Sequence, residues 1–128
     1  MIDRNYMLSL EGKLLGFHIR LKEIHFSAES MNLHKLTDEF DGALLKFDDA
    51  IMENLQPLPG FGTIKPGNIE VIMPEDREFK KILVAIRGLL SNFKTQATDT
   101  MYTGANSIVD GFFAVVNKYI YLAGIIGE

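Results

Sequence analysis

Four side chains that could ligate a metal recur at helical spacing in one stretch of this sequence. His34 and Asp38 are four residues apart, and so are Asp49 and Glu53. Residues four apart share one face of a helix, so each pair could grip one ion. Asp38 and Asp49 are eleven residues apart, about three turns, which puts all four on one stripe. Nitrogen and oxygen ligands of this kind suit iron or manganese, with zinc possible.

The two pairs are too far apart to share an ion within one chain. Nineteen residues separate His34 from Glu53, which is about 28 Å along a helix. The pairs share one midpoint, between Ala43 and Leu44. If two copies of the helix cross antiparallel there, His34 of one faces Glu53 of the other, and Asp38 faces Asp49. A two-fold dimer would then hold two identical sites.

Two further histidines precede the stripe. His25 lies nine residues before His34, close enough for a short turn to bring it to the same site, and His18 lies seven residues earlier on the same helix face. A second interpretation stays open, in which these acids form only the solvated face of a helix and the histidines are ordinary polar residues.

Helical spacing of apolar residues predicts four helices. The clearest series, which steps by three or four residues, is Leu33, Leu36, Phe40, Leu44, Phe47, Ile51 and Leu55. The expected ranges are 5–27, 32–55, 75–98 and 105–124. Glu75, Asp76 and Glu78 are expected in the first turn of the third helix, where the helix dipole favours acids.

All four prolines of the chain fall in 56–74, which we therefore expect to be a loop between the second and third helices. A short link would make these helices antiparallel, whereas a long crossover lets them run parallel. The expected fold is all-α, a ferritin-like four-helix bundle with a long crossover loop, in a single domain over 1–128.

Composition excludes several classes of site. The chain has no cysteine, so zinc-ribbon and iron–sulfur sites are excluded and His, Asp and Glu remain as strong ligands. The net charge of −4 argues against DNA binding. The apolar stretch 108–126 contains Asp110, Asn117 and Lys118, which favours a buried helix over a membrane span. We expect a cytoplasmic protein with no membrane contact.

These residues resemble the Dps-like miniferritins, a family named for DNA protection in starved cells. In that family a His that ends the first helix is followed by His-x3-Asp/Glu and Asp-x3-Glu on the second, the latter pair serving the two-fold partner. His25, His34-Lys-Leu-Thr-Asp38 and Asp49-Ala-Ile-Met-Glu53 are similar to these motifs. Phe26 and Tyr121 stand where the family usually has tryptophan, and we expect no counterpart of the family's Lys-rich N-terminal tail.

The resemblance implies a ferroxidase with His25, His34, Asp38, Asp49 and Glu53 as its ligands. It implies that ferrous iron is oxidised, with hydrogen peroxide as the favoured oxidant, and stored as mineral inside a hollow dodecamer. The alternative is a ferritin-like structural or oligomerisation protein without ferroxidase activity.

Overall fold

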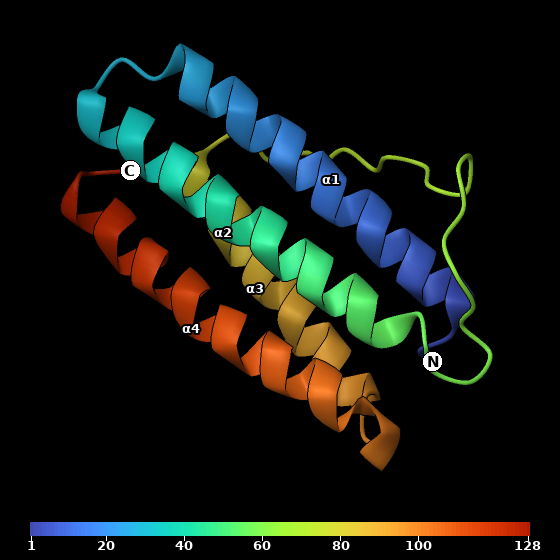
Figure 1. Ribbon diagram of the computed structural model, residues 1–128. Helices are drawn as coiled ribbons and strands as arrows, with labels where there is room; N and C mark the ends of the chain where they lie inside the picture. The colour runs from blue at the N-terminus through green and yellow to red at the C-terminus, as the bar shows by residue number, and fades with distance from the viewer.

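The computed structural model describes all 128 residues and contains only helices, as the sequence predicts. Its elements are α1 (Arg4–Ser27), α2 (Met31–Leu55), α3 (Phe79–Gln96), the 3-10 turn η1 (Thr100–Tyr102) and α4 (Thr103–Ile125). Figure 1 shows the four long helices side by side as a bundle. α1 packs along α2, α2 along α4 and α4 along α3.

Side-chain caps explain why α1 and α2 begin where they do. The Asp3 carboxylate accepts a hydrogen bond from the main-chain N–H of Tyr6 at 2.9 Å, and the Ser30 hydroxyl accepts one from that of Leu33 at 3.1 Å. Each cap satisfies an N–H group that has no partner inside the helix. The turn 28–30 is therefore short, and it sets the end of α1 beside the start of α2.

One apolar cluster of 28 buried residues fills the bundle. Phe40 lies at its centre, with its ring against those of Phe79, Phe112 and Tyr119. Besides the tyrosines Tyr102 and Tyr119, only Thr37 and Asp48 are buried residues with a polar side chain. The interior of the bundle therefore offers few metal ligands.

The third helix is shorter than expected. It begins at Phe79 rather than Glu75 and ends at Gln96 rather than 98, so Glu75, Asp76 and Glu78 precede it. Glu78 is extended, with φ −106° and ψ 140°. The guanidinium of Arg20, on α1, donates a hydrogen bond to the carbonyl of Pro74 at 2.9 Å. Phe79, five residues later, is buried in the core. Residues 75–78 between these anchors form no helix, and the helix begins only where Phe79 enters the core.

The segment 56–78 contains no helix or strand and passes along α1. The N–H of Ile72 donates to the carbonyl of Gly12 at 3.0 Å. A Cβ at Gly12 or Gly16 would collide with the main-chain oxygens of Glu70 and Ile72, respectively. The two glycines, one turn apart, thus form the groove in which this segment lies.

By length and composition alone, Thr100–Ile125 could cross a membrane, a property that core helices of soluble proteins share. In the bundle it buries Val109, Phe112 and Val116. Only 28% of its most apolar window is buried, so α4 exposes more of its surface than the sequence suggests.

Candidate functional site

His25 and His34 meet where α1 ends and α2 begins. Their rings are stacked, with centroids 3.8 Å apart and planes at 22°. Nδ1 of His25 lies 2.8 Å from the main-chain oxygen of His34, and Nδ1 of His34 lies 3.1 Å from that of His25. A carbonyl oxygen can only accept, so both Nδ1 atoms carry the proton. In the neutral rings both Nε2 atoms then keep a free lone pair.

The local fold explains this pairing. The carbonyl of His25 lies in the last turn of α1, where helical carbonyls have no intrahelical partner, and His34 supplies the missing donor. The hydroxyl of Thr37, which is fully buried, donates to the carbonyl of Leu33 at 2.9 Å and lies 3.4 Å from Nδ1 of His25. Thr37 thus supports His25 from the side of α2.

Asp38 lies beside His25 on the same small cavity. This cavity of about 100 Å³ is lined by Leu21, Lys22, His25, Phe26, Thr37, Asp38 and Asp41. Asp38 itself is exposed, and so is Phe26. The structure therefore brings His25, His34 and Asp38 to one end of the bundle.

Asp49 and Glu53 lie elsewhere, exposed on the second half of α2. Within one chain, no group of three or more His, Asp or Glu side chains could hold a metal ion. In the isolated chain the five predicted ligands therefore lie in two regions that are not themselves metal sites: His25, His34 and Asp38 at one end of the bundle, and Asp49 and Glu53 on the second half of α2.

The centre of the predicted crossing needs a correction. Leu44 is buried in the core and could not contact a second copy directly, and Ala43 is partly buried against the core. The exposed residues between Asp38 and Asp49 on the stripe are Gly42 and Leu45, which share the same midpoint. A Cβ at Gly42 would meet nothing within 4 Å, and Leu45 is 37% exposed.

A second set of polar residues, which the sequence reasoning missed, lies between α1 and α2. Glu11 faces Asp48, and His18 faces Asp41 with Nδ1 2.7 Å from a carboxylate oxygen. Glu11 and His18 are seven residues apart on α1. Their partners, Asp48 and Asp41, are seven residues apart on α2 in the reverse order. This matched spacing was the available signal. We call Glu11, His18, Asp41 and Asp48 the polar seam.

The carboxyl pair in the seam holds a proton at neutral pH. Burial, with the hydrogen bond to Asp48 and the charges of Asp48 and Asp49, raises the pKa of Glu11 to about 9. Burial also raises the pKa of Asp48, whose carboxylate accepts the hydrogen bond from protonated Glu11. Perturbed acids of this kind gather at functional sites, although structural pairs also occur.

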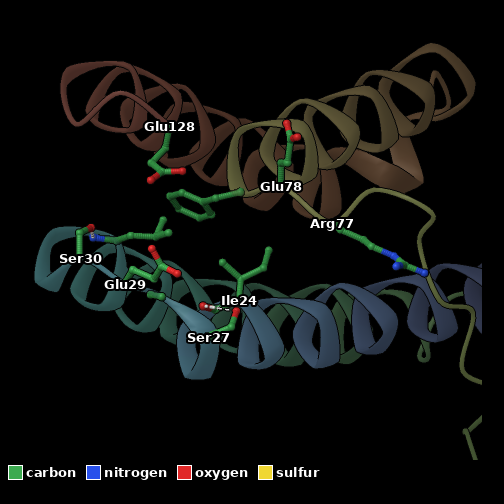
Figure 2. Close-up of a pocket in the computed structure, with 10 residues that line it drawn as sticks. Ile24, Ser27, Glu29, Ser30, Arg77, Glu78 and Glu128 are labelled. Atoms are coloured by element: carbon green, nitrogen blue, oxygen red, sulfur yellow. Dashed lines mark hydrogen bonds between the residues drawn. The ribbon is translucent and has the colours of Figure 1, made fainter.

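A wider pocket of about 520 Å³ lies at the same end of the bundle as His25. Figure 2 shows Glu29, Glu78 and Glu128 around it, near the beginnings of α2 and α3. Acids near helix N-termini offset the positive end of the helix dipole. The lining contains no His and no activated nucleophile, so this pocket is not the candidate site.

No protein-family model, no curated protein and no solved structure matches this chain.

Proposed function

We propose that this chain is a ferroxidase of the Dps-like miniferritin type, with ferrous iron as its substrate. The site would join His25, His34 and Asp38 of one chain with Asp49 and Glu53 of the partner subunit. The observation that carries the proposal is the pair of reciprocal bonds from His25 and His34 to each other's main-chain carbonyls.

These bonds are typical of metal-binding histidines. A ligating His nearly always donates its other ring N–H to a carbonyl or carboxylate, which fixes the tautomer and the ring orientation. Both rings meet this condition, and each keeps Nε2 for an ion. With Asp38 beside His25 the ligands are mixed nitrogen and oxygen, a set that suits ferrous iron and that manganese or zinc could occupy as substitutes.

The second half of the site needs a two-fold partner. An antiparallel crossing about the midpoint of the stripe sets Leu45 over the open backbone at Gly42 of the partner subunit. The shape at the centre of the crossing therefore favours the contact that closes the site.

The helix connectivity supports a ferritin-like bundle. In Figure 1, α2 and α3 run in the same direction, and 56–78 passes from the end of one to the start of the other. A long connection between parallel helices is the arrangement found in ferritin-like folds.

In the proposed reaction two ferrous ions each give one electron to hydrogen peroxide, which takes up two protons and leaves as two waters. His25 and His34 would hold ferrous iron through Nε2. Asp38, with Asp49 and Glu53 of the partner subunit, would stabilise the higher charge of the ferric product. We further propose that the product is stored in a closed oligomeric shell, a dodecamer if the chain assembles as the resemblance implies.

A structural role is the competing proposal. The reciprocal histidine bonds tie α1 to α2 with or without a metal, and no three ligands gather in a single chain. A bundle that only oligomerises would need no more.

Iron oxidation separates the two proposals. Ferrous iron and peroxide are added to the apoprotein, and ferric absorbance is followed for the parent, a His34→Ala, Asp38→Ala variant and the control Glu75→Gln, which changes an exposed acid in 56–78. We expect fast oxidation by the parent and control and a rate near that of buffer for the double variant. A parent that matches buffer, or that is monomeric at every working concentration, overturns the proposal.

A further inference from the structure

A pocket rich in hydrogen-bond donors lies at the opposite end of α1 from His25. It has a volume of about 610 Å³ and lies where the start of α1 meets the segment 56–78 (Figure 1). Two of its lining residues carry a positive charge, none carries a negative charge and only one is hydrophobic. The lining consists of Arg4, Gly60, Phe61, Gly62, Thr63, Lys65 and Asn68.

Arg4 is fixed against this segment, but no carboxylate neutralises its charge. Its Nη1 donates to the main-chain oxygens of Phe61 and Thr63 at 2.7 and 3.3 Å, and its Nη2 donates to Oδ1 of Asn68 at 3.1 Å. These acceptors are neutral, and none of the four ion pairs of the chain includes Arg4. A guanidinium has five N–H groups, so Nε and one proton of Nη2 remain unused.

Other unused donors line the same pocket. The ammonium group of Lys65 is exposed and forms no ion pair, while the main-chain N–H of Lys65 donates to Oδ1 of Asn68 at 2.8 Å. The main-chain N–H groups of Gly60, Gly62 and Thr63 donate to no acceptor of the chain. The pocket therefore offers three kinds of donor, namely guanidinium, ammonium and main-chain N–H, and no acid that would compete for them.

We propose that this pocket binds an oxyanion of the phosphate class, either free or as a phosphate monoester. A guanidinium presents paired N–H groups that match two oxygens of such an anion, and hydrogen bonds between charged groups are the strong ones. Main-chain N–H groups of a turn can bind further oxygens. The anion would neutralise Arg4 and Lys65 and would tie the segment 56–78 to the start of α1.

This site is separate from the proposed iron site and requires neither iron nor a second copy. Arg4 begins α1, whereas His25 lies about 31 Å further along the same helix. None of the five proposed iron ligands lines the pocket. Failure of the ferroxidase proposal would therefore leave the anion site untouched, and the reverse also holds.

Isothermal titration calorimetry with inorganic phosphate tests the proposal, on the metal-free protein in a buffer without phosphate or sulfate. We expect one phosphate per chain, with a dissociation constant below about 1 mM. Lys65→Gln removes a charge from a side chain that makes no hydrogen bond, and should weaken binding by about twofold to fivefold. The control Lys80→Gln changes an exposed lysine on α3 that forms no ion pair, and should leave binding unchanged.

Arg4→Lys keeps the charge but loses the paired N–H groups, so it should weaken binding by at least about tenfold. Because this variant also loses bonds to the segment 56–78, circular dichroism checks its fold, and Lys65→Gln keeps the test independent of it. A parallel titration with phenyl phosphate distinguishes an esterified from a free phosphate by which of the two binds more tightly. Absence of saturable binding to the parent overturns the proposal and leaves Arg4 as a residue that only fastens the segment. Binding that neither Lys65→Gln nor Arg4→Lys weakens places the anion elsewhere and overturns it too.

Discussion

His25 and His34 each donate the Nδ1 proton to the main-chain carbonyl of the other, across a turn of three residues. The two rings are thereby locked in the same tautomer and stacked at 3.8 Å. Neither ring needs a ligand to hold this orientation, so the nitrogens that would bind iron are set in place in advance. Pre-organisation of this kind lowers the entropic cost of binding.

A shared site predicts complementation between two inactive variants. His34→Ala removes a ligand from one half-site and Glu53→Gln from the other, so each variant alone should oxidise iron slowly. In a mixed dimer, the intact His34 of one chain meets the intact Glu53 of the other, and one of the two sites is complete. Random co-assembly should restore about a quarter of the parent rate.

The measurement is ferric absorbance after co-expression of the two variants. The matched control combines His34→Ala with Asp38→Ala, both from the same half-site, and should stay inactive. If the first mixture remains as slow as its components while dimers form, the partner does not complete the site.

The antiparallel crossing predicts that Leu45→Glu separates the subunits. Leu45 is 37% exposed beside Gly42, at the centre of the stripe. A carboxylate there would face Asp38 and Asp49 of both copies and repel them. Light scattering should show a smaller assembly, with slower iron oxidation. Val84→Glu changes a residue of similar exposure, 44%, on α3 and should alter neither. An unchanged mass for Leu45→Glu would place the contact on another face.

The helices whose apolar residues recur at regular spacing could be predicted from the sequence. α1, α2 and α4 begin and end within two residues of the expected bounds, because apolar spacing reports a helix directly. The start of α3 was missed because it depends on two distant anchors, Arg20 and Phe79. The acids at 75, 76 and 78 favoured an earlier start of α3. The contacts that hold the connecting segment in place come from distant residues, so no local sequence pattern reveals them.

For the site, sequence spacing identified candidates on one helix but not contacts between two. The separation of His34 from Glu53 follows from helix rise alone. The Glu11–Asp48 contact depends on the register of α1 against α2, which the turn 28–30 sets and the side chains then satisfy. Matched seven-residue spacing on both helices carries that information only when the two helices are known to be antiparallel.

The raised pKa of Glu11 predicts that the folded chain loses stability at alkaline pH. Its pKa is raised from 4.5 to about 9 on folding, so between these values the folded chain holds a proton that the unfolded chain has lost. Stability falls with rising pH wherever the native state binds more protons. The contribution is fully present below about pH 4.5 and disappears as pH rises through about 9. Glu11→Gln keeps the hydrogen bond without titrating, so its melting temperature should fall less than that of the parent.

Thermal melts from pH 5 to pH 10, without divalent cations, measure this difference. Glu75→Gln, at an exposed position, should follow the parent curve. Parallel curves for Glu11→Gln and the parent would show that Glu11 is ionised in the folded chain at neutral pH.

Alanine in place of Gly12 or Gly16 should destabilise the chain, whereas alanine in place of an unobstructed helical glycine should stabilise it. Alanine normally stabilises a helix interior by about 1 kcal/mol relative to glycine. At Gly12 and Gly16, however, a methyl group would collide with the main-chain oxygens of Glu70 and Ile72. The segment 70–73 must then move off α1, which should cost about 1–3 kcal/mol for each substitution. Gly88→Ala, in the middle of α3 with nothing within 4 Å, is the matched control and should stabilise the chain. Urea unfolding measures the three free energies, and a stabilising Gly12→Ala would mean that this segment does not lie on α1 in solution.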